Sequence, residues 1–174
     1  MTKKLLVFSH GLESGPWGSK ITSMAEIGKK AGFDVISVDY QGMREPQPRV
    51  DKLLQTLAEN RADCVVLVGS SMGGHVATAA ANEQPVAGLF VLAPAFFMPG
   101  YETLTPAVPA CPMQIVHGWH DDVVPLENSL RFARAAAVPL AIVDSDHRLG
   151  SALPVINEML ADFLHRCCAA AKAQ

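Results

Sequence analysis

The stretch CVVLVGSSMGGHVATAAA, from Cys64 to Ala81, decides the fold of this chain. It starts as a short apolar run without alternation, which is typical of a strand buried on both faces of a parallel sheet. It then passes through glycines and serines and leaves in small residues that suit a helix. The turn matches G-x-S-x-G in one frame only, with Ser71 in the centre. This pattern marks a sharp strand-to-helix turn that holds a serine hydroxyl out at the end of a sheet.

The two glycines of this pattern have a steric reason. A side chain at Gly69 or Gly73 is expected to collide with neighbouring backbone in so crowded a turn. Ser71 would then lie at a helix N-terminus, where unpaired N–H groups and the helix dipole favour developing negative charge. The alternative is a glycine-rich turn with a solvated serine. The predicted strand before it and helix after it favour the catalytic interpretation.

Composition limits the class of protein. A chain of 174 residues is about one domain, covering 1–174. With 49% hydrophobic and 18% charged residues, it can build a sizeable core. The net charge of -3, without any basic cluster larger than a lysine pair, argues against a nucleic-acid partner. The four cysteines lack metal-ligand spacing and indicate thiols in a reducing compartment. The first apolar run is too short for a signal peptide and no run approaches a membrane span, so we expect a cytoplasmic protein.

Short apolar runs alternate with helical patterns along the rest of the chain. This alternation predicts the α/β class, with an open, doubly wound, mostly parallel sheet of about six strands and helices on both faces. Such sheets bind ligands outside the carboxyl ends of their strands. The loops after the strands are therefore where we expect chemistry, and 41–48 is expected to be a loop. The predicted strands are 5–9, 33–38, 64–68, 88–93, 113–116 and 140–143, and the predicted helices are 19–30, 50–60, 75–81, 126–137 and 154–168.

The loop after the first strand reads SHGLESGPW, from Ser9 to Trp17. A glycine that follows a strand lets the backbone turn so that an N–H group faces the site. In serine hydrolases this loop and the residue after the nucleophile each supply one N–H donor to an oxyanion. In this chain those donors would be Leu12 and Met72. The alternative is a plain strand-to-helix turn.

Two later loops carry a carboxylate and a histidine. HGWHDDVVP, at 117–125, offers two aspartates that could orient a histidine and stabilise its cation. Its histidines and aspartates could also be metal ligands, but a second cluster of ligands is missing. DSDHRL, at 144–149, places His147 where a general base should lie, although a plain polar loop histidine would look the same. The order Ser71, Asp121, His147 is the order of the α/β-hydrolase triad.

The whole chain resembles a minimal α/β-hydrolase. The resemblance rests on FSHGLESGP after the first strand, GSSMGG at the turn, and the two later loops, which resemble small esterase and thioesterase-like members. In the H-G-x-x-D-x-x-V-P pattern of that family the acid falls on Asp121, with Pro125 in register and Asp122 as second choice. The chain departs from full-length members because it lacks the antiparallel strands before the first parallel strand. It also lacks a cap domain, since only 96–112 is available where a cap usually inserts.

This resemblance implies a serine hydrolase that cleaves small carboxylic esters or thioesters through an acyl-enzyme on Ser71. It implies a small-molecule acyl substrate and no cofactor or metal. The same residues would also serve a binding or sensing module, an acyl transferase or a cofactor-free lyase of the same fold. Residues 96–98 either wall the site or plug the edge of the sheet. The expected apolar walls are Leu12, Trp17, Met72, Phe96, Phe97, Met98 and Leu149.

Overall fold

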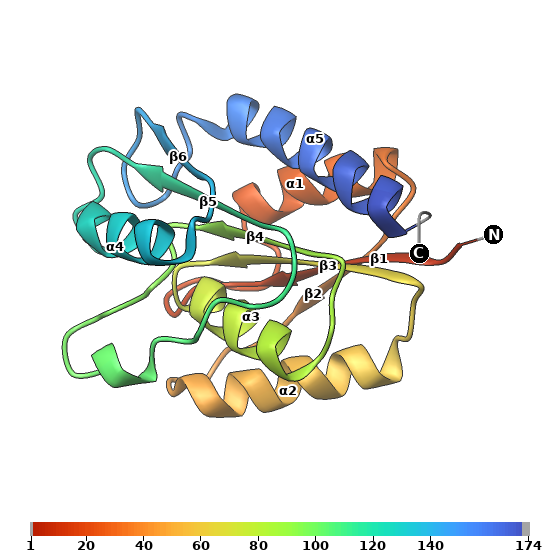
Figure 1. Cartoon of the computed structure of the whole chain (residues 1–174), viewed down its shortest axis with the longest axis horizontal. Helices are drawn as coiled ribbons and strands as arrows, with labels where there is room; N and C mark the ends of the chain where they lie inside the picture. The colour runs from red at the N-terminus through yellow and green to blue at the C-terminus, as the bar shows by residue number, and fades with distance from the viewer. Residues whose placement is uncertain (1, 172–174) are drawn as a thin grey trace.

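A six-stranded sheet runs through the part of the chain that the computed structural model describes, residues 2–171, and its strands all pair in parallel (Figure 1). The spatial order is β2-β1-β3-β4-β5-β6. The predicted α/β class with a doubly wound parallel sheet is confirmed. The strands are β1 (Lys4–Ser9), β2 (Asp34–Val38), β3 (Cys64–Ser70), β4 (Gly88–Leu92), β5 (Met113–Gly118) and β6 (Leu140–Val143).

Helices cover both faces of this sheet. Figure 1 shows α1 and α5 on one face, with α2 and α3 on the other, where α4 also packs. The long helices are α1 (Ser19–Lys30), α2 (Pro46–Glu59), α3 (Met72–Glu83), α4 (Leu126–Ala136) and α5 (Leu153–Ala171). None of the helices in the described residues is both long and apolar enough to cross a membrane.

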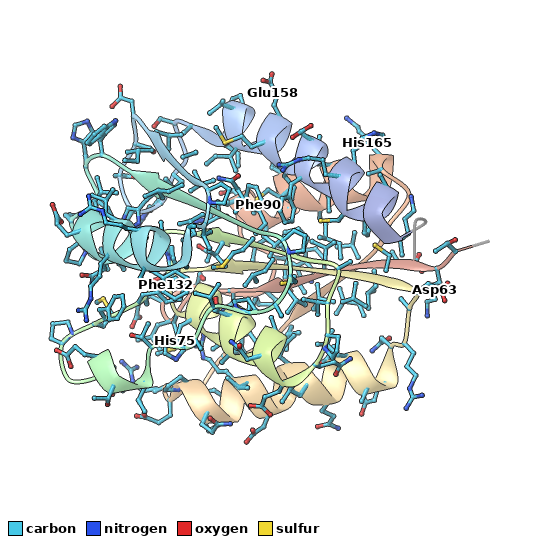
Figure 2. The ribbon with its side chains drawn as sticks, viewed as in Figure 1. Asp63, His75, Phe90, Phe132, Glu158 and His165 are labelled. Atoms are coloured by element: carbon cyan, nitrogen blue, oxygen red, sulfur yellow. The ribbon has the colours of Figure 1, made fainter. Side chains whose placement is uncertain are left out.

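Two cores explain why the strands read as continuous apolar runs. In β3, Val66 and Val68 pack under α1 and α5, whereas Leu67 packs under α2 and α3. Phe90 of β4 meets Phe163 of α5 edge to face, with ring centroids 5.6 Å apart. Phe90 and Phe132 lie on opposite sides of the sheet in Figure 2. Both faces of a strand therefore need apolar side chains, and alternation disappears.

The start of α2 differs from the sequence prediction. The helix begins at Pro46, so the last part of the predicted loop at 41–48 is helical. Pro46 and Pro48 lie in the first turn of the helix. An N–H group at these positions would have no acceptor within the helix, so proline, which lacks this group, costs no hydrogen bond there. The prolines were a helix start signal and not a loop signal. This correction places Arg49 on a helix and on its buried side.

The strand order brings two loops together. β1 pairs with β2 on one side and with β3 on the other, and Ser9 is in register with Gly69. The chain therefore leaves β1 and β3 side by side at the carboxyl edge, which is the switch point where such sheets bind ligands. Between β4 and β5, the described chain forms only the short 3₁₀ turn η1 (Glu102–Leu104) and irregular segments, so no cap domain lies there.

Candidate active site

Ser71 lies at the sharp turn between β3 and α3. Its backbone has φ 54° and ψ −120°, a strained conformation for a residue other than glycine. A Cβ at Gly69 would overlap the carbonyl of Gly73, and a Cβ at Gly73 would overlap the carbonyl of Ser9. The expected steric role of both glycines is confirmed. The turn is therefore held tightly against the end of β1.

The neighbouring Ser70 faces a different partner. Its Oγ accepts a hydrogen bond of 2.8 Å from Nζ of Lys20, in the first turn of α1. Burial lowers the pKa of Lys20 to about 8, although the carboxylates of Asp121 and Asp146 act in the opposite direction. The lysine was not singled out from the sequence. The two adjacent serines therefore have different partners, because Ser70 contacts Lys20 and Ser71 contacts His147.

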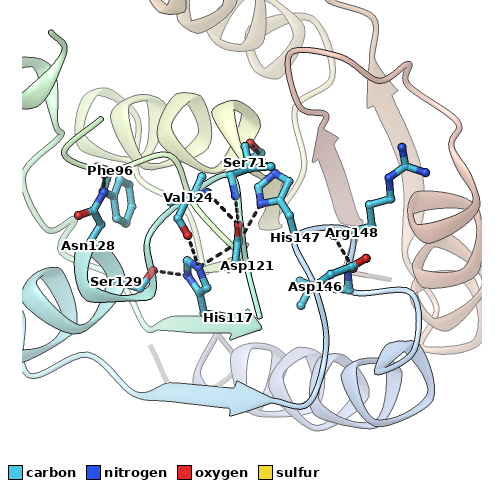
Figure 3. A network of polar contacts seen from close by, with 12 residues as sticks. Ser71, Phe96, His117, Asp121, Val124, Asn128, Ser129, Asp146, His147 and Arg148 are labelled. Atoms are coloured by element: carbon cyan, nitrogen blue, oxygen red, sulfur yellow. Dashed lines mark hydrogen bonds and ion pairs between the residues drawn. The ribbon is translucent and has the colours of Figure 1, made fainter. Parts of the chain in front are cut away.

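A continuous chain of hydrogen bonds joins Ser71 to Asp121 through His147 (Figure 3). Nε2 of His147 lies 3.1 Å from Oγ of Ser71, and Nδ1 lies 2.8 Å from Oδ2 of Asp121. The carboxylate can only accept, so Nδ1 carries the proton and Nε2 presents a lone pair to the serine hydroxyl. The structure thus brings together the three side chains that the sequence picked from three separate loops.

Asp121, and not its neighbour, contacts the histidine. Its side chain is 0% exposed, whereas Asp122 lies exposed at the surface. Oδ1 accepts from the N–H groups of Val123 and Val124, at 2.9 and 2.8 Å. Burial alone would raise the pKa of Asp121, but the hydrogen bonds from His147 and the two amides outweigh it, so the pKa is lowered. Asp121 is therefore ionised at neutral pH.

His117 is a second histidine on the same carboxylate. Its Nε2 lies 3.0 Å from Oδ2 of Asp121 and 3.0 Å from the carbonyl oxygen of Val124, and its Nδ1 lies 2.8 Å from Oγ of Ser129 (Figure 3). Both oxygens near Nε2 only accept, so Nε2 carries the proton and the Ser129 hydroxyl donates to Nδ1. Burial lowers the pKa of His117, which keeps the ring neutral. The bond from His117 to the acid was not expected from the sequence.

The loops after β5 and β6 are tied to each other. Trp119 N–H donates to Val143 O, and His120 N–H donates to Ser145 O, at 2.9 and 3.0 Å. A Cβ at Gly118 would overlap the Ser145 carbonyl, so glycine permits this close approach. His120 turns outward and pairs with exposed Asp144. Among the side chains that the structure describes, no three His, Cys, Asp or Glu residues form a group that could hold a metal ion.

The loop after β1 lies directly against the Ser71 turn. A Cβ at Gly11 would be 3.4 Å from Cβ of Ser71 and 3.6 Å from the carbonyl oxygen of Ser70. Neither the Leu12 N–H nor the Met72 N–H finds an acceptor among the described residues. No hydrogen bond within the described residues therefore occupies either of the groups expected to bind an oxyanion.

The expected apolar walls divide into two groups. Phe96 and Leu149 are fully buried, Phe96 stacked on Phe132 of α4 and Leu149 within the core under α1 and α5. Neither offers surface to a substrate, so neither walls the site as expected, and for Phe96 the alternative of a plug at the edge of the sheet holds. Trp17 is 53% exposed. Leu12, Met72, Phe97 and Met98 are partly exposed.

An apolar surface beside Asp121 was missed from the sequence. Trp119 is 60% exposed and Val123 is 55% exposed. They share a hollow of about 360 Å³ that Asp121 borders. Large exposed apolar side chains beside a polar site are a recognisable signal for ligand contact. The sequence does not show this exposure, and its one available signal was a tryptophan in the loop HGWHDDVVP, which follows a predicted strand.

Comparison with known proteins places this arrangement in a family. The model of the alpha/beta hydrolase family matches residues 6–169, so the chain belongs to that family and is a hydrolase by fold and kinship. No curated protein matches the chain.

Solved structures of similar fold agree with this family assignment. A protein described as a hydrolase of the alpha/beta superfamily, from Xanthomonas campestris pv. campestris, is 29% identical, with a TM-score of 0.84 over 95% of this chain and 99% of that one. Est1E from Butyrivibrio proteoclasticus is 18% identical, with a TM-score of 0.82 over 97% and 89% of the two chains. An alpha-beta serine hydrolase homologue from Coxiella burnetii is 24% identical, with a TM-score of 0.75 over 93% and 85%. The last two show likeness of fold alone.

Proposed function

We propose that the protein is a serine hydrolase that cleaves small carboxylic esters or thioesters through an acyl-enzyme on Ser71. The observation that carries this proposal is the hydrogen-bonded chain from Oγ of Ser71 through His147 to Asp121. A strained serine between two sterically required glycines, with a histidine lone pair on its hydroxyl, is arranged for nucleophilic attack. Packing gives no reason for this arrangement.

The first half of the reaction would form the acyl-enzyme. Oγ of Ser71 attacks the acyl carbon while Nε2 of His147 takes the hydroxyl proton. The electron pair of the carbonyl moves to its oxygen, where the N–H groups of Leu12 and Met72 would bind the oxyanion. Ionised Asp121 keeps the imidazole in the required tautomer and stabilises its cation. When the tetrahedral intermediate collapses, His147 gives the proton to the leaving alcohol or thiol.

The second half would repeat these steps with water. His147 takes a proton from water, the resulting hydroxide attacks the acyl carbon, and the proton returns to Oγ of Ser71 as the acid leaves. The residues described above suffice for these steps. The exposed rings of Trp17 and Trp119 and the side chains of Phe97 and Met98 would contact the substrate.

A fluorophosphonate probe and an ester assay test the proposal together. We expect wild-type protein to gain one covalent phosphonate on Ser71, located by peptide mass spectrometry, and to hydrolyse p-nitrophenyl acetate. Ser71→Ala should lose both, whereas Ser70→Ala should retain both with an unchanged circular dichroism spectrum. Ester turnover by Ser71→Ala at the wild-type rate would exclude the proposed nucleophile. Labelling of Ser71 without turnover of any ester or thioester would favour the binding or sensing module.

A further inference from the structure

A buried arginine lies behind the loop that follows β1. Arg49, on α2, is only 1% exposed. Its Nη1 donates to the carbonyl oxygens of His10 and Gly11, at 3.0 and 3.3 Å, and its Nε donates to the carbonyl of Met43 at 2.8 Å. No carboxylate within residues 2–171 forms an ion pair with it. Burying a charge without a counter-ion is costly, so a structure that keeps one needs a reason.

The guanidinium is held in one orientation. It lies over the ring of Tyr40, with Cζ 5.1 Å from the ring centroid. The ring of Tyr40 is itself buried, and its hydroxyl contacts Oγ of Ser9 at 3.2 Å. Burial lowers the pKa of Arg49, but a guanidinium starts so far above neutrality that it stays charged. A fixed positive charge therefore faces the carbonyls of His10 and Gly11.

His10 supports the same peptide group. Its Nε2 accepts the backbone N–H of Tyr40 at 2.8 Å, so the proton must be on Nδ1. Nδ1 lies 2.8 Å from the carbonyl oxygen of Gly11 and donates to it. Burial lowers the pKa of His10, which keeps this tautomer neutral. The Gly11 carbonyl thus accepts from a neutral histidine and from a charged arginine.

The Gly11 carbonyl and the Leu12 N–H belong to one peptide group. The chain contains no cis peptide bond in its described residues, so this N–H points away from the carbonyl and hence away from the buried guanidinium. Hydrogen bonds on the carbonyl polarise the amide and make its N–H a stronger donor. We infer that Arg49 is a positioning residue that fixes and polarises the Gly11–Leu12 peptide for binding a developing oxyanion. This role rests on the proposed serine hydrolase activity.

The test compares p-nitrophenyl acetate with its thionoacetate analogue, in which sulfur replaces the carbonyl oxygen. A developing sulfur anion is a poor hydrogen-bond acceptor. The kcat/KM for the oxoester divided by the kcat/KM for the thionoester therefore reports how much the N–H donors contribute. Loss of one whole donor costs about 10² to 10³ in rate. For Arg49→Met, which weakens one donor, we expect kcat/KM for the oxoester to fall roughly 10- to 50-fold. The thionoester should lose no more than a few fold, so the ratio should fall.

Controls separate this role from loss of stability. Leu57→Val, on the buried side of the same helix but two turns away, should lower the thermal midpoint and leave the ratio unchanged. Arg61→Met removes an exposed arginine just beyond α2 and should change neither quantity. Arg49→Lys keeps a charge in the core but cannot hold the same carbonyls with a planar fork, so its ratio should fall in the same direction by less.

An unchanged ratio in folded Arg49→Met or in folded Arg49→Lys would overturn the role of Arg49. Fluorophosphonate labelling of the wild-type protein distinguishes failure of the role of Arg49 from failure of the proposed serine hydrolase function. If wild-type Ser71 is labelled and turns over the oxoester while the ratio is constant among the variants, only the inference about Arg49 fails. If the wild type is neither labelled nor active, the serine hydrolase proposal fails and the role of Arg49 fails with it.

Discussion

Asp121 and Asp122 are adjacent carboxylates with opposite surroundings. Asp121 is enclosed by two histidines and two amides, whereas Asp122 faces solvent. The sequence favoured Asp121 only through its register with Pro125. The contacts now supply a physical reason, because the carboxylate that lies within hydrogen-bond distance of the partly buried imidazole of His147 is that of Asp121.

We expect Asp121→Asn to lower kcat/KM for p-nitrophenyl acetate by about 10² to 10⁴. The new amide group can donate to Nδ1 of His147, which moves the histidine proton to Nε2 and removes the lone pair that Ser71 needs. Asp122→Asn should stay within about twofold of wild type, as is usual for an exposed side chain. A larger loss for Asp122→Asn than for Asp121→Asn would move the acid to Asp122.

Lys20 predicts a pH dependence of stability. Its pKa is about 8 in the folded protein against an ordinary value of 10.5, so between these values the unfolded chain binds more protons than the folded one. Stability from this group therefore rises with pH across that window, and below pH 8 the buried charge is a constant cost. Lys20→Met should unfold with a free energy higher than wild type at pH 7, by up to about 3 kcal/mol. Urea titrations at pH 7 and pH 10 should show this advantage shrinking, and an advantage that grew with pH would contradict the shift.

At the scale of elements, the β3–α3 turn is fixed by close contact with β1. Gly73→Ala would drive a Cβ into the carbonyl oxygen of Ser9, so the turn and the loop after β1 would have to separate. We expect a loss of about 1 to 3 kcal/mol of stability, as for other overpacked sites, together with most of the esterase activity. Gly150→Ala is the control, because a Cβ there meets nothing within 4 Å. Thermal unfolding and ester turnover would measure both effects, and an active, stable Gly73→Ala protein would refute this account of the turn.

Elements with a local signal could be predicted from the sequence, whereas contacts between elements could be predicted only where a family pattern links the residues, as it does for Ser71, Asp121 and His147. The buried runs predicted the strands, and G-x-S-x-G predicted the turn at Ser71. The sequence left open whether Phe96 walls the site or plugs the sheet edge, because its burial depends on a ring of α4, far along the chain. The bond from His117 to Asp121 was missed because it depends on the path of a loop.

The burial of Arg49 did leave a trace in the sequence. Arg49, Leu53 and Leu57 recur at intervals of four, so the arginine continues the apolar stripe of α2. A charged residue on such a stripe indicates a buried polar contact. The loop assigned to 41–48 hid this pattern, because the predicted helix then began at Val50, one residue after Arg49.

At the scale of the whole molecule, the connection between β4 and β5 forms only the turn η1 and irregular segments, and under the proposed function this should limit substrate size. Without a cap, the proposed substrate contacts would come from rings that face solvent, including Trp17 and Trp119. A methylene that reaches apolar wall gains about 0.8 kcal/mol of burial, but one that extends past a shallow wall gains little. We expect kcat/KM for p-nitrophenyl esters to peak at short acyl chains. A series from acetate to palmitate measures this, and a steady rise toward palmitate would mean that a deep acyl channel exists.

The order of the strands has a consequence for a chain as it is being synthesised. β1 leaves the ribosome first, yet one of its two neighbours, β3, follows only after α1, β2 and α2. The histidine that contacts Ser71 lies 76 residues beyond it, after the last strand. A nascent chain can therefore complete the turn at Ser71 while its hydroxyl still lacks a base. If Ser71 is the nucleophile, as proposed, it should become reactive only when the loop that carries His147 has emerged, and shorter chains should not react with a fluorophosphonate.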